Sequence, residues 1–285
     1  MEKAVLGVKI DDIPEEKAAE IIAEWVTTGD PQVAGPAPLY PSRQGGSDLH
    51  AVGSPSKQVT RRLLVGPPVS RHPFKSKIVV TVNPEFLVAT QKDPEFQKIL
   101  NRADLSVPDG VGLKLFAGLE NRVTGVDLLL KLCQLAAAKG WTVGLFGGEE
   151  GVAKKAKTKL EERFPGLKVA WAVDGREADE ERNNEELIRK NGEVDLLFVA
   201  LGQVKQERFL EALRTAGVYK VGMGVGGAFD YLSGRVTRAP KFLRLAGLEW
   251  AYRLAHQPQR LGRIVNAVVV FPLQLAIKKG TSKRV

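Results

Sequence analysis

The sequence predicts an α/β fold with a mostly parallel, Rossmann-like sheet covered by helices on both faces, followed by a basic, apolar helical appendage. Two observations predict the sheet: short runs rich in Val, Ile and Leu recur along the chain, and amphipathic helical patterns separate most of them. A third observation predicts the appendage. The last 51 residues hold 11 Lys or Arg and a single acid, whereas the whole chain has a net charge of only +9.

The N-terminal part begins with a predicted strand and helix. Val5–Ile10 has the pattern of a short strand, and Asp12 is in position to cap a helix that has Pro14 near its first turn and ends at about Thr27. The segment 31–74 holds eight of the 16 prolines, many Gly and Ser, and no sustained apolar period. We expect it to be a disordered insertion that interrupts the catalytic domain.

A regular alternation of strands and helices follows the insertion. The predicted strands are Ile78–Val82, Leu105–Val107, Thr142–Phe146, Val169–Val173, Leu196–Leu201 and Lys220–Val225. The predicted helices between them are Pro94–Asn101, Val111–Leu119, Leu128–Lys139, Gly151–Phe164, Asp179–Lys190 and Lys205–Ala216. Because parallel strands of this kind bind ligands beyond their carboxyl ends, the residues after each strand are the candidates for function.

We divide the chain into a catalytic domain, 1–240, and a membrane-association appendage, 241–285. The longest apolar stretch, Ile264–Ile277, has 14 residues, whereas a membrane-spanning helix needs about 20. Basic residues interleaved with Trp250 and Tyr252 favour peripheral attachment to anionic lipid. The alternative is a helix pair packed on the core with a solvated basic face. The apolar face could also pair with a second subunit, as a homo-oligomer. We expect no nucleic-acid partner, because no nucleic-acid motif accompanies the charge.

Polar residues follow the first two core strands. Thr81 and Asn83 can direct a hydroxyl and an amide into a cleft, or Asn83 can simply cap the helix that begins at Pro84. Asp109 can likewise cap a helix at Val111. However, the three histidines lie in the insertion and the basic tail. A carboxylate is therefore the expected acid–base group of the cleft, and Asp109 is well placed for this role.

Glycines and polar side chains follow two later strands, Thr142–Phe146 and Lys220–Val225. Gly147 and Gly148 precede a helix and can either let backbone amides approach a phosphate or form a tight structural turn. Gly226 and Gly227 permit close approach of a ligand, and Asp230 can hold a sugar or a base. The sole cysteine, Cys133, excludes an intramolecular disulfide and is typical of a reducing cytoplasm.

A series of motifs in this order resembles the WecG/TagA/CpsF family of bacterial glycosyltransferases over nearly the whole chain outside the insertion. The motifs are Thr81-Val82-Asn83-Pro84-Glu85-Phe86, Pro108-Asp109-Gly110, Phe146-Gly147-Gly148, Gly202-x-x-Lys205-Gln206-Glu207, Gly224-Val225-Gly226-Gly227-Ala228-Phe229-Asp230, Gly234-Arg235-Val236-x-Arg238-Ala239-Pro240 and Gly247-Leu248-Glu249-Trp250-x-Tyr252-Arg253-Leu254. One departure is Gln203-Val204, where the family usually has a small residue and a proline. We expect this exchange to loosen the loop while keeping Gln206.

The resemblance implies an inverting hexosyltransferase on the inner, cytoplasmic face of the plasma membrane. It would move a sugar, typically of the N-acetylmannosamine type, from a UDP-sugar to an undecaprenyl-diphosphate-linked saccharide. The product would enter a cell-surface polymer such as teichoic acid, capsule or exopolysaccharide.

By position, Asp109 resembles the family's proposed general base, and Asp230 resembles a residue that contacts the nucleotide. The resemblance places Thr81, Asn83 and Gln206 in the pocket and implies that tail arginines close over it. We count as catalytic Asp109, Thr81, Arg253, Arg260 and Arg263, and as substrate-binding Asn83, Gly147, Gly148, Gln206, Gly226, Gly227, Asp230, Arg235 and Arg238.

No metal or other cofactor is expected. The chain contains no Asp-x-Asp pair to hold a metal on the donor diphosphate. Arginines are the natural substitutes, because guanidinium groups bind phosphate oxygens bidentately. Two other functions are weighed: a nucleotide-binding oxidoreductase, which lacks its dinucleotide fingerprint here, and a non-catalytic lipid-binding scaffold, which leaves the polar loops after the strands without a purpose.

Overall fold

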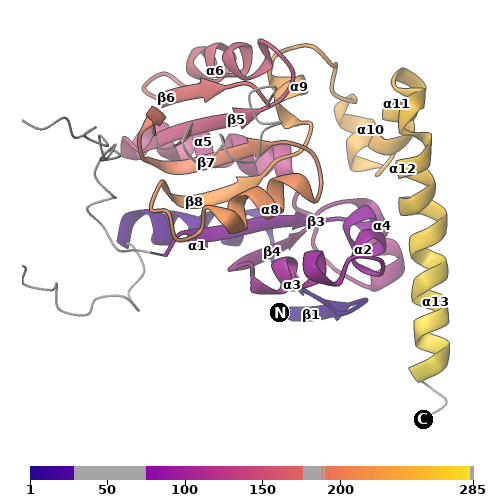
Figure 1. The fold of residues 1–285 in the computed structure, drawn as a ribbon. Helices are drawn as coiled ribbons and strands as arrows, with labels where there is room; N and C mark the ends of the chain where they lie inside the picture. Colours follow the sequence, from indigo (N-terminus) through magenta and orange to yellow (C-terminus); the bar gives the residue numbers. More distant parts are fainter. Residues whose placement is uncertain (29–74, 176–187, 189, 283–285) are drawn as a thin grey trace, which may run out of the picture.

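The computed structural model describes residues 1–28, 75–175, 188 and 190–282, and it has the predicted α/β architecture (Figure 1). Six parallel strands form the main sheet in the order β4-β3-β8-β7-β5-β6. Their bounds are β3 Lys77–Val82, β4 Leu105–Pro108, β5 Thr142–Gly147, β6 Lys168–Val173, β7 Val194–Ala200 and β8 Tyr219–Gly224. All six predicted strands are confirmed to within two residues. The insertion 31–74 and most of the predicted helix Asp179–Lys190 lie outside the described residues.

Helices cover both faces of this sheet, which explains why the strands are apolar on both sides. One core joins the sheet to α1 Glu15–Thr28, α5 Gly125–Lys139, α6 Val152–Arg163 and α9 Ala228–Leu232. The other core joins it to α2 Pro84–Thr90, α3 Pro94–Arg102, α4 Val111–Ala117 and α8 Lys205–Ala212. Cys133 is buried in the first core.

The N-terminus differs from the prediction. Instead of one strand over Val5–Ile10, the chain forms an antiparallel hairpin of β1 Glu2–Val5 and β2 Val8–Asp11. The turn is made by Leu6 and Gly7, with φ of 50° and 84°. This turn lacks the Asn-Gly or Asp-Gly pair that makes a hairpin recognisable in a sequence.

The prediction that Asp12 caps α1 is also wrong. Its carboxylate accepts hydrogen bonds from the backbone N–H groups of Glu120 and Asn121 at 2.9–3.1 Å and from Lys3 Nζ at 2.8 Å. Burial alone would raise the pKa of Asp12, but these bonds hold the pKa well below its usual range. Asp12 therefore ties the hairpin to the segment that leads into the site.

The appendage is mostly helical in the described residues and lies along one side of the domain (Figure 1). Its elements are α10 Lys241–Leu245, α11 Glu249–His256, a 3₁₀ turn Pro258–Arg260, α12 Leu261–Val265, a π turn Asn266–Val270 and α13 Phe271–Ser282. The last helix packs on α2 and α4, and Phe271 and Leu275 are buried there.

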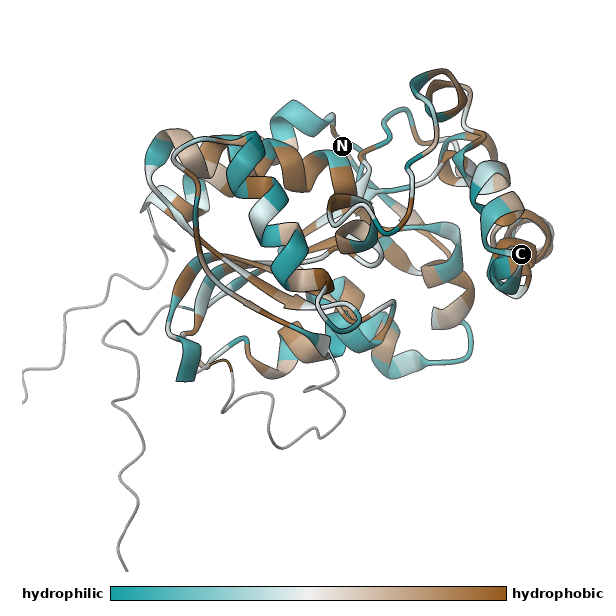
Figure 2. Cartoon of the chain, turned by 90° about the horizontal axis from the view of Figure 1, so that it is seen from above, coloured by the Kyte–Doolittle hydropathy of each residue, from teal (hydrophilic) through white to brown (hydrophobic). Residues whose placement is uncertain are grey.

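The side of the helical run Pro258–Lys278 that faces away from the domain is apolar and open to solvent. Its exposed side chains are Leu261, Val265, Val268, Val269, Leu273 and Ile277. The helical run Pro258–Lys278 has 21 residues, and in the described part of the chain it is the one helix whose length and composition would suffice to cross a membrane. Seen from above, the appendage stands beside the domain with alternating hydrophobic and hydrophilic bands (Figure 2).

Candidate active site

A cavity of about 780 Å³, open to solvent, lies at the carboxyl edge of the sheet beneath the appendage. Ends of β3, β4 and β8 supply its floor, and α11 and α12 supply its outer wall. Ten of the 14 predicted site residues line it: Thr81, Asn83, Asp109, Gln206, Gly226, Gly227, Arg238, Arg253, Arg260 and Arg263. Further lining residues that were not among the predicted site residues include Phe86, Thr124, Gly125, Tyr231 and Glu249.

Asp109 lies at the end of β4, deep in this cavity but with part of its surface open to it. Its carboxylate accepts a weak hydrogen bond from the Gly125 N–H at 3.4 Å. It does not cap α4, because the cap position is Gly110, which has a φ of 96°. Burial raises the pKa of Asp109 to about 6, with Arg122 acting in the opposite direction and Glu249 in the same direction. This places a carboxylate with a near-neutral pKa in the cavity.

Thr81 lies near the end of β3, and Asn83 is the first residue after this strand. The Asn83 side chain accepts a hydrogen bond from the Phe86 N–H at 3.0 Å, so it does cap α2. Both residues also line the cavity. The cap uses only the side-chain oxygen of Asn83, and a role in binding a ligand stays a prediction.

Gln206 is fixed by a chain of buried hydrogen bonds. Its amide oxygen accepts from the Gly226 N–H at 2.9 Å, and its amide nitrogen donates to Glu207 Oε1 at 2.6 Å. Glu207 Oε2 accepts from the Val204 N–H at 2.8 Å, and burial raises the pKa of Glu207 to about 7. Val204 has a φ of 70°, unusual for a β-branched residue. The loop with the Gln203-Val204 exchange is thus strained but held by hydrogen bonds to Glu207, a motif residue to which the sequence assigned no role.

Gly147 and Gly148 lie outside the residues that line the cavity. A side chain at Gly147 would meet the backbone of Ala200 at 2.6 Å, so close strand packing accounts for this glycine. The N-terminus of α6 is already occupied by the Asp174 carboxylate, which accepts from the N–H groups of Gly151 and Ala153 at 2.9 and 3.1 Å. The tight-turn alternative therefore describes this loop.

Asp230 and Arg235 are not among the residues that line the cavity, but Asp230 lies beside the lining residue Gly227. Asp230 Oδ2 is 3.5 Å from where a Cβ on Gly227 would lie. Burial raises the pKa of Asp230, and Arg235 and Arg260 oppose this rise. Arg235 itself pairs with Glu149 at 2.6 Å at the surface.

Three arginines of the appendage meet at the cavity. Arg253 lies over the Tyr231 ring at 4.6 Å and donates to the Tyr231 hydroxyl. Arg263 Nε pairs with Glu85 at 2.7 Å. For the guanidinium group of Arg260, the structure records no hydrogen bond or ion pair within the described ranges. Burial and then the charges of Arg253 and Arg263 lower the pKa of Arg260. The cluster therefore carries more positive charge than its neighbours neutralise.

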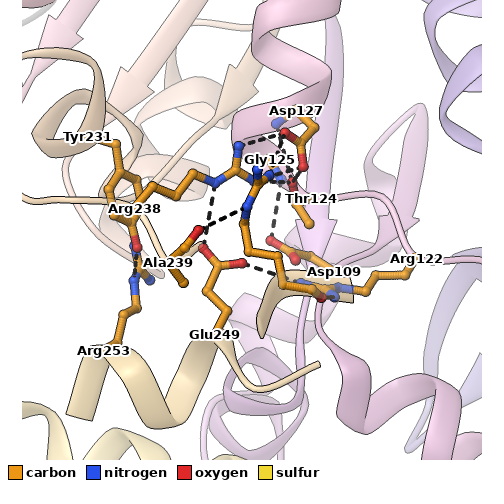
Figure 3. Close-up of polar contacts among 11 residues, drawn as sticks. Asp109, Arg122, Thr124, Gly125, Asp127, Tyr231, Arg238, Ala239, Glu249 and Arg253 are labelled. Atoms are coloured by element: carbon orange, nitrogen blue, oxygen red, sulfur yellow. Dashed lines mark hydrogen bonds and ion pairs between the residues drawn. The ribbon is translucent and has the colours of Figure 1, made fainter. Parts of the chain in front are cut away.

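A second charged network connects the appendage to the loop before α5 (Figure 3). Arg238 forms a bidentate pair with Asp127 at 2.6 and 2.7 Å, so its charge is already used inside the protein. Glu249 contacts both Arg122 and Arg238, at 3.4 and 3.7 Å. The one available sequence signal for this network was that Glu249 is the single acid of the basic tail.

No group of three or more His, Cys, Asp or Glu side chains that could hold a metal ion occurs within residues 1–28, 75–175, 188 and 190–282. The cavity instead combines a carboxylate, neutral hydrogen-bonding groups and a cluster of arginines. Such a set can accept a proton and bind a strongly anionic group in one place.

Comparison with known proteins gives a consistent result. The model of the glycosyl transferase WecG/TagA/CpsF family matches residues 61–285. A relative from Bacillus subtilis (strain 168), named N-acetylglucosaminyldiphosphoundecaprenol N-acetyl-beta-D-mannosaminyltransferase, is 34% identical over 194 residues, which are 66% of this chain and 75% of the relative. A relative of the same name from Bacillus spizizenii is 32% identical over 197 residues, covering 67% of this chain and 76% of the relative.

Proposed function

We propose, because this chain belongs to the WecG/TagA/CpsF family of glycosyl transferases, that it moves an N-acetylmannosamine-type sugar from a UDP-sugar to an undecaprenyl-diphosphate-linked saccharide. The name of the two relatives supports the acceptor and the transferred sugar. The product would serve a cell-surface polymer such as wall teichoic acid. The observation that carries the proposal is the cavity in which Asp109 and three appendage arginines come together.

In the proposed reaction, Asp109 accepts the proton of an acceptor hydroxyl. The hydroxyl oxygen attacks the anomeric carbon of the donor while the bond from that carbon to the UDP oxygen breaks, and the electron pair leaves with UDP. Attack opposite the leaving group inverts the anomeric configuration. A pKa of about 6 suits this task, since the carboxylate is ionised at neutral pH yet remains more basic than an ordinary aspartate.

The departing diphosphate gains negative charge in the transition state and needs a cationic partner. Arg260 is the strongest candidate, because it faces the cavity without a carboxylate of its own among the described residues. Arg253 and Arg263 add to the positive potential, and Arg263 would exchange Glu85 for phosphate. Gly226, Gly227 and Asp230 are proposed to hold the nucleotide beside them. This arrangement needs no metal.

The test of this function is transfer by the full-length protein from UDP-N-acetylmannosamine to a prenyl-diphosphate-linked N-acetylglucosamine in vesicles. We expect UDP release to match the formation of a β-linked disaccharide lipid, measured by chromatography and NMR. UDP-N-acetylglucosamine serves as the matched donor control and should give slower transfer. Tight binding of NAD but not UDP, measured by calorimetry, would instead support an oxidoreductase.

We further propose that the appendage holds the protein on the inner face of the membrane as a peripheral protein. Its exposed apolar stripe would enter the acyl boundary while basic residues such as Lys241 meet anionic headgroups. Burial of Phe271 and Leu275 against the domain supports a helix that lies at the surface.

Vesicle flotation tests this attachment. Replacing both Val269 and Leu273 with Asp should abolish retention on vesicles of phosphatidylglycerol and phosphatidylcholine, because two charges would enter the apolar boundary. Thr158→Asp, which adds a charge to an exposed position on α6, should leave retention unchanged. Equal retention of the double variant and wild type would refute the membrane role of this face.

A further inference from the structure

Glu249 occupies an unusual position for an acid, as the first residue of α11 in a tail that is otherwise basic. Its carboxylate lies between two guanidinium groups, with Oε2 3.4 Å from Arg122 Nη2 and Oε1 3.7 Å from Arg238 Nε (Figure 3). Side-chain exposure is only 17% for Glu249 and 23% for Arg122. This pair is thus largely shielded from water and much less screened than a surface salt bridge.

Arg122 has two bonds that hold it on the appendage side of the cavity. Besides the contact with Glu249, its Nη1 donates to the carbonyl oxygen of Arg244 at 2.8 Å. The charge of Arg122 nevertheless acts on Asp109. Burial has the largest effect and raises the pKa of Asp109, and Arg122 is the strongest of the groups that lower it. Among the described residues the hydrogen bond to the Asp109 carboxylate comes from the Gly125 N–H at 3.4 Å, not from Arg122.

These contacts suggest what Glu249 does for the site. We propose that Glu249 is a positioning residue for Asp109: by holding Arg122 on the appendage, it keeps this guanidinium from pairing with Asp109 and leaves the carboxylate free to take a proton. The inference rests on the proposed function, in which Asp109 is the base. The appendage then contributes an anion that sets the strength of the base as well as the arginines that meet the leaving group.

The charges around Asp109 give the sign of the effect. Arg122 and Arg253 lower the pKa of Asp109, whereas burial and Glu249 raise it. Arg238 and Asp127 lie behind Glu249 and largely neutralise each other. Removing the charge of Glu249 takes away a repulsion and also frees Arg122 to pair with Asp109. Both changes stabilise the ionised carboxylate, so the pKa of Asp109 must fall and its strength as a base must decrease.

The test is Glu249→Gln in the full-length protein, which keeps the shape of the side chain and removes its charge. The titration of Asp109 is followed by NMR of the ¹³C-labelled carboxyl group, assigned with the spectrum of Asp109→Asn. We expect the pKa of Asp109 to fall below its wild-type value of about 6. The acidic limb of kcat/KM should move to lower pH by the same amount. The value of kcat at neutral pH should drop about tenfold, with a smaller change in the KM of the donor.

Three comparisons separate this effect from a loss of contact between the appendage and the domain. Glu85 also ties the appendage to the domain, through Arg263 at 2.7 Å, but it is not among the main groups that act on Asp109. Glu85→Gln should therefore leave the pKa of Asp109 unchanged. Glu249→Asp keeps the charge and should therefore preserve part of the raised pKa of Asp109. Arg122→Met in the Glu249→Gln background should raise the pKa of Asp109 again.

The outcomes distinguish the two proposals. An unchanged titration of Asp109 in Glu249→Gln would overturn the inference, whatever happens to the rate. If the pKa of Asp109 falls while the acidic limb of the rate stays where it was, the role of Glu249 stands and Asp109 is not the base. Should Glu249→Gln fail to fold, Arg122→Met alone decides: the inference requires a raised pKa of Asp109, and an unchanged pKa refutes it.

Discussion

Asp109→Asn is expected to lower kcat roughly 10²–10⁴-fold, the usual contribution of a general base. Binding of UDP should change little, because the proposed nucleotide contacts are Gly226, Gly227 and Asp230. The loss should therefore appear in the transfer step, measured as single-turnover formation of the disaccharide lipid with saturating donor and acceptor.

The same substitution should stabilise the protein at alkaline pH. Burial raises the pKa of Asp109 from 3.8 to about 6, so between these two values the folded state binds more protons than the unfolded state. Stability then falls as the pH rises through this window, and above pH 6 the penalty reaches at most about 3 kcal/mol. Asn carries no such penalty, so urea unfolding at pH 8 should show a gain.

A matched control exists at the opposite end of the sheet. Asp195 pairs with Lys220 at 2.7 Å and accepts from the Thr142 N–H at 2.7 Å, and these contacts hold its pKa below the usual range despite partial burial. Asp195→Asn should therefore lose stability at pH 8 and keep its turnover. A loss of turnover equal to that of Asp109→Asn would show that the assay reports folding and not chemistry.

Arg260→Ala is expected to lower kcat by about 10²–10³-fold, by analogy with the loss of one donor to a developing anion. Arg260 is held in the cavity beside Arg253 and Arg263, and burial together with their charges lowers its pKa. An incoming diphosphate relieves this repulsion. Arg260→Lys should recover only part of the rate, since an ammonium group cannot bind phosphate oxygens in the same bidentate geometry.

The measurement for Arg260 is steady-state transfer with a short-chain acceptor in detergent, which removes any effect of membrane binding. Lys241→Ala, which removes an exposed positive charge from the same appendage, is the control and should keep the wild-type rate. If Arg260→Ala raised only the KM of the donor and left kcat unchanged, the arginine would bind the ground state and would not stabilise departing UDP.

The sheet could be predicted because its strands are buried on both faces and therefore form near-continuous apolar runs. β7 Val194–Ala200, for example, is buried at all but one of its positions. The N-terminal hairpin could not be predicted in this way, because Leu6 adopts a positive φ without a turn motif. Asp12 looked like a helix cap because its partners, Glu120 and Asn121, lie more than 100 positions away in the sequence.

The site shows the same division between local and distant information. Strand ends identified Asp109 and the glycines after β8, since each follows an apolar run directly, and the family resemblance added Gln206. The family resemblance added the arginines of the appendage, and the structure places Arg253, Arg260 and Arg263 at the cavity. The pairing of Arg122 with Glu249 spans 127 positions, and no local pattern reveals which of many charged residues meet across such a distance.

The pH dependence of the single-turnover transfer rate tests the central claim most directly. With wild-type protein on vesicles that contain the acceptor, the rate should fall as the pH decreases through about 6, because Asp109 takes up a proton at that value. The residual rate of Asp109→Asn should lack this limb. A wild-type rate that stays constant through pH 6, or an identical limb in Asp109→Asn, would contradict a base at this position.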